Sequence, residues 1–236
     1  KYIALMDCDD YWYNPDKLER QVRYLESHPD CSMTVHAAAV QNDRGELVNR
    51  NLMRPYRGDR DLSPAELVDK AGSFPFGAML LRREVVEKLP EWYFRCPVGD
   101  RPLELLSALK GYCHYADRFD SVYRFHGSGS WTEEMKSGDF KKKQDRYARA
   151  MRELYRAFDR ESGGRYHREA VSAARRVYFL TRVNLRDYGE IFSPRNRRYY
   201  RELPLRDRFF IRAERELPFL FAGLRRVRDR IFGQER

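Results

Sequence analysis

The chain has few cysteines and no long apolar run, and both shortages narrow the class of protein. Its four cysteines are far apart and form no Cys-x-x-Cys pair (Cys8, Cys31, Cys96 and Cys113). A dense disulfide framework is therefore excluded, and reduced cysteines in a cytoplasmic protein are expected. No stretch reaches the roughly 18 apolar residues of a membrane-spanning helix, and no signal peptide is visible. We expect a cytoplasmic protein, at most peripheral at the inner face of the membrane.

Positive and negative charges nearly balance in the body of the chain, and most of the net positive charge lies in its tail. The whole chain carries a net charge of +10. Residues 194–236 alone hold thirteen arginines and six acidic residues, a net charge of +7. Apolar residues recur in this tail at helical spacing (Leu217, Leu220, Phe221, Leu224, Val227 and Ile231). They predict a basic amphipathic helix, which either lies on an anionic membrane surface or packs on the domain.

The most informative segment is an apolar tract that ends in three carboxylates. Residues 3–6 are continuously apolar, and Asp7, Asp9 and Asp10 follow within four positions. Such a run predicts a strand buried on both faces of an α/β sheet, and ligand sites gather at the carboxyl ends of those strands. Several carboxylates in one place are costly unless a cation neutralises them. The tract therefore predicts a metal site.

The rest of the chain predicts a mixed α/β part followed by a helical part. The expected elements are a helix ending near 28, strands at 32–40, 46–48 and 76–81, short helices from 63 and at 83–89, a helix at 102–110, and short strands at 112–115 and 121–126. From about Asp139 long helices are expected, with a break at 162–164. We expect a domain at 1–135 and a basic, mostly helical extension at 136–236.

Several segments, in order along residues 1–135, resemble the family 2 glycosyltransferases. The resembling parts are Asp7 to Trp12 for the Asp-x-Asp region, Phe74 to Arg83 for the middle strand, Pro97 to Leu103 for the catalytic segment, and Val122 to Trp131 for the closing loop. The resemblance implies a partial GT-A fold, which is an α/β mixed sheet with flanking helices. It also implies an inverting transfer of a hexosyl or related sugar from a nucleotide-diphosphate sugar donor, in the manner of enzymes that build cell-envelope polysaccharides.

The resemblance further implies roles for particular side chains. Asp7, Asp9 and His126 would hold Mg²⁺ or Mn²⁺, which bridges the diphosphate of the sugar donor. Asp100 would be the general base that takes the proton of an acceptor hydroxyl on a glycan or a lipid-linked molecule. Arg124 would face phosphate oxygens, and Trp131 would close over the sugar donor as a lid.

The sequence departs from the family pattern in two places. Many relatives carry Glu-Asp at the catalytic segment, whereas this chain has Gly99-Asp100. The chain also begins with Lys1 inside an expected buried strand, so we expect the family's N-terminal nucleotide-binding strands to be missing from it. We therefore expect an N-terminally truncated fragment that binds nucleotide weakly and is inactive alone.

Simpler roles and other functions compete with this hypothesis. Asp9 would otherwise cap a turn, Asp100 would cap a helix, and His126 would be a hydrogen-bonded residue at a strand end. A phosphatase of the haloacid-dehalogenase type also uses Asp-x-Asp, but it needs a small turn where this chain has a tyrosine and a tryptophan. A non-catalytic relative, or a basic protein that binds a membrane surface or nucleic acid, is the further alternative. Six acidic residues in the tail argue against nucleic acid.

Overall fold

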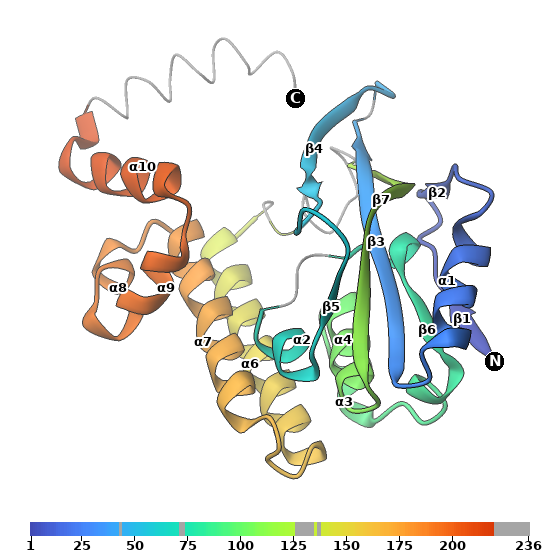
Figure 1. Cartoon of the computed structure of the whole chain (residues 1–236). Helices are drawn as coiled ribbons and strands as arrows, with labels where there is room; N and C mark the ends of the chain where they lie inside the picture. The colour runs from blue at the N-terminus through green and yellow to red at the C-terminus, as the bar shows by residue number, and fades with distance from the viewer. Residues whose placement is uncertain (43, 71–73, 126–134, 136–137, 220–236) are drawn as a thin grey trace.

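The computed structural model describes residues 1–42, 44–70, 74–125, 135 and 138–219 (Figure 1). Its sheet has seven strands in the order β1-β6-β3-β7-β2, with β4 paired to β3 and β5 paired to β7. The strands are β1 (Tyr2–Ala4), β2 (Tyr11–Trp12), β3 (Cys31–Gln41), β4 (Leu47–Met53), β5 (Arg60–Leu62), β6 (Leu80–Arg82) and β7 (Tyr112–Arg124). Strands β3 and β7 run parallel at its centre, and the other pairings are antiparallel. The sheet is therefore mixed, as the sequence predicts.

Helices flank the sheet and form the C-terminal part. They are α1 (Lys17–Ser27), α2 (Pro64–Lys70), α3 (Glu91–Phe94), α4 (Asp100–Ala108), α6 (Phe140–Glu161), α7 (His167–Asn184), α8 (Tyr188–Ile191), α9 (Arg197–Glu202) and α10 (Leu205–Glu216), with 3-10 turns η1 (Phe76–Ala78), η2 (Arg83–Val85) and η3 (Pro194–Asn196). In Figure 1, α1 lies on one side of the sheet and α2 and α4 on the other, with α6 and α7 beyond them. The predicted fold class, a GT-A-like α/β domain followed by helices, is confirmed.

The main core joins the sheet to the first two long helices. Met33 and Val35 of β3 belong to the same buried cluster as Leu154 and Phe158 of α6 and Ala173 of α7. Side chains at alternate positions of β3 point to one face of the sheet, so this cluster fills the face that α4 covers. Long helices therefore contribute to the core of the sheet. The domain boundary expected after residue 135 stays a prediction.

Strand β7 is longer than the sequence indicates. Two short strands were expected at 112–115 and 121–126, but one strand pairs with β3 from Tyr112 to Arg124, with register shifts along the way. The polar stretch between the expected strands is held by tertiary partners. Asp117 receives two hydrogen bonds of 2.6 Å from Arg54. Because these partners are distant in sequence, local polarity wrongly suggested a break. The strand expected at 76–81 likewise begins as η1 and becomes β6 only at Leu80.

Two other local predictions are confirmed, whereas the strand expected at residues 3–6 with both faces buried is wrong: β1 ends at Ala4, lies at the edge of the sheet and is only partly buried. Ser63 and Glu66 form the predicted capping box, in which the Ser63 N–H donates to the Glu66 carboxylate at 2.9 Å. The expected break between the long helices falls at Gly163 and Gly164, whose φ angles are +62° and +78°. Glycine reaches these angles without the steric cost that other residues meet.

The C-terminal helices form a small second cluster around Phe179, Ile191, Tyr199 and Ile211. The amphipathic helix expected from Leu217 to Ile231 lies almost wholly outside the described residues. Among the residues that the structure describes, no helix is both long enough and apolar enough to cross a membrane.

Candidate functional site

The loop after β1 carries the three aspartates and is held in place at both ends. Its turn is closed by a hydrogen bond from the Asp10 N–H to the Asp7 carbonyl at 3.2 Å. The chain then forms β2, in which Tyr11 pairs with Val122 of β7. The indole N–H of Trp12 donates to the Gly77 carbonyl at 2.8 Å. Main-chain pairing and the indole bond therefore hold the main chain of this loop in place.

Asp10 connects this loop to the end of β7. Its carboxylate accepts a hydrogen bond of 2.9 Å from the Arg124 N–H. The guanidinium group of Arg124 lies over the ring of Tyr11, 5.1 Å from the ring centroid. Arg124 is thus placed beside the acidic loop, on the part of β7 that leads to residues 126–134. His126 and Trp131 lie in that segment, outside the described residues.

Asp7, Asp9 and Asp100 lie close enough together to influence one another, and we call them the acidic cluster. The pKa of Asp7 is raised by burial and then by the negative charges of Asp9 and Asp100. The pKa of Tyr123 is raised by burial and by the charges of Asp10 and all three members of the cluster. Two segments distant in sequence therefore meet at one site, and Tyr123 of β7 lies beside them.

Asp100 is the first residue of α4, and Gly99 occupies the N-cap position. The carboxylate of Asp100 accepts a hydrogen bond of 2.7 Å from the N–H of Arg101. Burial raises the pKa of Asp100, against the effect of this hydrogen bond. A carboxylate with a raised pKa is a stronger base than an exposed one.

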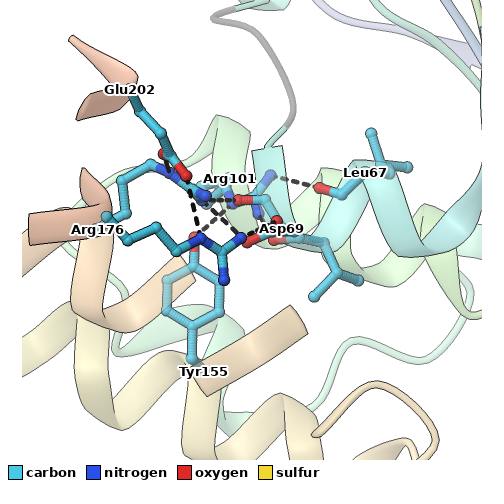
Figure 2. A network of polar contacts seen from close by, with 8 residues as sticks. Leu67, Asp69, Arg101, Tyr155, Arg176 and Glu202 are labelled. Carbon is cyan, nitrogen blue, oxygen red and sulfur yellow. Dashed lines mark hydrogen bonds and ion pairs between the residues drawn. The ribbon is translucent and has the colours of Figure 1, made fainter. Parts of the chain in front are cut away.

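Arg101 anchors the start of α4 in the protein interior (Figure 2). Its Nε donates to the hydroxyl of Tyr155 of α6 at 2.8 Å, and its Nη1 donates to the carbonyl of Leu67 of α2 at 2.8 Å. The guanidinium also forms an ion pair with Glu104, one turn along α4. A buried, multiply bonded guanidinium holds its neighbours in one geometry. The network therefore fixes the direction in which Asp100 leaves the helix.

The glycine before Asp100 is explained by its contact with Phe76. A Cβ atom added at Gly99 would lie 2.5 Å from the Cζ atom of the Phe76 ring. Any side chain at position 99, including a glutamate, would collide with that ring. This chain therefore pairs Gly99 with Phe76, and Asp100 stands without an acidic neighbour at position 99.

Gly99→Ala is expected to destabilise the protein by about 1–2 kcal/mol, because the new methyl group overpacks the site against Phe76. Chemical denaturation measures the change. The matched control is Gly189→Ala, since the nearest atom to a Cβ there is at an ordinary 3.6 Å. Phe76→Leu in the Gly99→Ala background is expected to recover part of the loss. Equal stability of Gly99→Ala and the wild type would contradict the packing argument.

A buried cation under the acidic loop was not predicted from the sequence. Lys17 of α1 is only 1% exposed. Its Nζ lies 4.3 Å from the ring centroid of Trp12 and donates to the Gln21 amide oxygen at 2.8 Å. Burial lowers the pKa of Lys17 to about 8. The sequence signal that precedes this buried lysine is the Asn14-Pro15-Asp16 turn, which Lys17 directly follows. The position of Tyr123 of β7 beside the acidic cluster was likewise not predicted from the sequence.

The donor set suits a small divalent cation. Carboxylate oxygens are the ligands that Mg²⁺ prefers, and it commonly takes one or two from the protein and the rest from water and substrate phosphates. Burial first, and then the charges of Asp9 and Asp100, raise the pKa of Asp7, and a bound cation would oppose these effects. Within the described part of the chain, no group of three His, Cys, Asp or Glu side chains is arranged to hold a metal ion. Asp7 and Asp9 as metal ligands therefore stay a prediction.

Comparisons with known proteins are consistent with the α/β fold and include the loop after β1 in the matched region. Residues 1–90 match the model of glycosyl transferase family 2. Uncharacterized proteins of Mycobacterium bovis and of two strains of Mycobacterium tuberculosis are 28% identical over 137 residues. That alignment covers 56% of this chain, and the chain spans only 36% of the length of each relative. The family match ends ten residues before Asp100. Residues 1–90, which include Asp7 and Asp9, are therefore similar to glycosyl transferase family 2.

Proposed function

We propose that the whole protein is an inverting glycosyltransferase that moves a hexosyl or related sugar from a nucleotide-diphosphate donor to a hydroxyl acceptor, a glycan or a lipid-linked molecule of the cell envelope. The family match supports a glycosyltransferase in general. One observation supports the catalytic detail: Asp100 of α4 reaches the aspartates of the loop after β1, as the effect of its charge on Asp7 indicates.

In this proposal the members of the acidic cluster have different roles. Asp7 and Asp9 hold Mg²⁺ or Mn²⁺, which when bound neutralises the diphosphate that leaves. Asp100 accepts the proton of the acceptor hydroxyl while that oxygen bonds to the anomeric carbon. The bond from the anomeric carbon to the phosphate oxygen breaks at the same time, and its electron pair stays on the diphosphate. Attack from the opposite side inverts the anomeric carbon.

The segment around Arg124 completes the proposed site. Arg124 is fixed beside the loop by its main chain, so its guanidinium can exchange the Tyr11 ring for a phosphate oxygen. His126 as a third metal ligand and Trp131 as a lid remain predictions, because both lie outside the described residues.

The function is tested by incubating the whole protein with a panel of nucleoside-diphosphate sugars and Mn²⁺. We expect release of nucleoside diphosphate from one donor, and NMR of the product should show an inverted anomeric configuration. Retention of configuration would contradict the role of Asp100. Phosphate release from simple phosphomonoesters would favour the phosphatase hypothesis instead.

We also propose that the C-terminal part contacts an anionic membrane surface. Large apolar side chains of α10 and the residues after it are exposed, namely Leu205 at 76%, Phe209 at 68% and Phe219 at 91%. Arginines of the same helix accompany them, including Arg206, whose guanidinium lies 5.7 Å from the Phe210 ring centroid. Apolar side chains beside cationic ones are typical of helices that lie in the interface of an anionic bilayer.

Leu205→Ser combined with Phe209→Ser is expected to weaken co-sedimentation with phosphatidylglycerol liposomes about tenfold, because two side chains lose their burial in the bilayer. Phe94→Ser is the matched control, since Phe94 is 71% exposed but belongs to α3. If the double variant and a chain lacking residues 205–236 both bind as the wild type does, this surface has no membrane role.

A further inference from the structure

A groove runs between α6 and α7 and is closed at one side by η3, and we call it the α6–α7 groove. Its volume is about 680 Å³, within the range of pockets that bind small ligands. It is hollow because alanines face it from both helices, Ala148 on α6 and Ala170 and Ala174 on α7. None of these residues belongs to the acidic cluster, so the groove is a second site.

Arginines surround this groove. Arg152 and Arg156 stand one turn apart on α6, and Arg175 faces them from α7. Within the described part of the chain, none of the three has a hydrogen-bond or ion-pair partner, whereas Arg195 at the η3 side is paired with Glu190. Three unpaired guanidinium groups from two helices can converge on one anion. Phosphate suits them because each guanidinium can donate two parallel hydrogen bonds to its oxygens.

The floor of the groove offers carbon rather than polar groups. Tyr155 contributes its ring, but its hydroxyl is occupied on the other side, where it accepts a hydrogen bond from Arg101 at 2.8 Å. Asp159, the acidic side chain among the lining residues, contacts His167 at 2.7 Å through one carboxylate oxygen, and its other oxygen is the buried acceptor there that has no partner among the described residues. A nucleobase or a peptide main chain would find few partners on such a floor. A hydrocarbon chain would be well accommodated, because it needs none.

We propose that the α6–α7 groove binds a membrane lipid with a phosphate headgroup. The phosphate lies against Arg152, Arg156 and Arg175, and the first carbons of the acyl chains lie on Ala148, Ala170 and Ala174. Charge complementarity selects the headgroup, and the apolar floor selects the tail. This inference goes beyond the proposed transfer reaction, and it shares no residue with the proposed membrane contact of α10.

The test is calorimetric titration of the chain with dioctanoyl phosphatidic acid below its critical micelle concentration. We expect saturable binding that Arg152→Gln combined with Arg175→Gln weakens at least about tenfold, because two charge-assisted contacts are lost. The control is Arg83→Gln combined with Arg146→Gln, which removes the same charge from exposed positions outside the groove and is expected to bind as the wild type does. Val171→Asp adds a negative charge at the rim and should weaken binding without disturbing the fold, which circular dichroism verifies.

Three further ligands test whether the headgroup, the acyl chains or negative charge alone accounts for binding. Dioctanoyl phosphatidylcholine, which has the same tails and a zwitterionic headgroup, and inorganic phosphate, which has no tail, should each bind at least about tenfold more weakly than phosphatidic acid. Equal binding of inorganic phosphate would overturn the lipid assignment, because the floor would then contribute nothing. Tighter binding of an oligoglutamate peptide would overturn it in favour of an acidic protein partner. Unchanged binding by both groove variants would overturn it altogether.

Discussion

Asp100→Asn is expected to lower kcat of the whole protein about a thousandfold, because the amide cannot accept the proton of the acceptor hydroxyl. The Arg101 network holds the start of α4 independently of the Asp100 charge, so the amide should keep the position of the carboxylate. Binding of the sugar donor, measured by calorimetry with Mn²⁺, is therefore expected to change little. A loss confined to kcat distinguishes a base from a residue that binds substrate.

The pH dependence of the reaction gives an independent measurement of the same role. The base must be deprotonated, so kcat/KM should fall as the pH falls through the pKa of Asp100. Burial raises that pKa above the ordinary 3.8, so activity should be lost at a higher pH than an exposed aspartate would require. Glu87→Gln removes an exposed carboxylate outside the site and should leave the profile unchanged. Unaltered transfer by Asp100→Asn would show that the chain is a non-catalytic relative or that another residue is the base.

Asp7→Asn is expected to have opposite effects with and without metal. Without metal, the raised pKa of Asp7 means that the folded state binds its proton more tightly than the unfolded state does. Stability contributed by this group is present at low pH and is lost as the pH rises through the interval between the unfolded and the folded pKa. At neutral pH the charged Asp7 is therefore a cost, and the amide should raise the melting temperature.

In the presence of Mn²⁺ the wild type should have a higher melting temperature than Asp7→Asn. Binding to the folded state stabilises the wild type, whereas the variant has lost one carboxylate ligand. We expect its Mn²⁺ dissociation constant to rise at least about tenfold. Melting curves in EDTA and in Mn²⁺ measure both effects on one sample, with Glu87→Gln as the control. A variant that is less stable than the wild type in EDTA, or equally stabilised by Mn²⁺, would contradict the assignment of Asp7.

Much of the local structure was predictable because neighbours along the chain determine it. The capping box at Ser63 and Glu66 and the break at Gly163-Gly164 depend on residues a few positions apart, and both were predicted. The buried strand expected directly before Asp7 and Asp9 was wrong, because β1 ends at Ala4, lies at the edge of the sheet and is only partly buried. The continuity of β7 was not predictable, because its middle is held by Arg54 and Gly58, which are distant in sequence.

The sequence by itself determined the chemistry available to this protein: a group of carboxylates after a short apolar tract, a lone acidic residue at position 100, and a surplus of arginine towards the C-terminus. Only the tertiary structure decided which of these groups meet. It brought Asp100 to the acidic loop, set Gly99 against Phe76, and aligned three unpaired arginines along the α6–α7 groove. Such contacts depend on packing between segments that are far apart in the chain, and no local pattern encodes that packing.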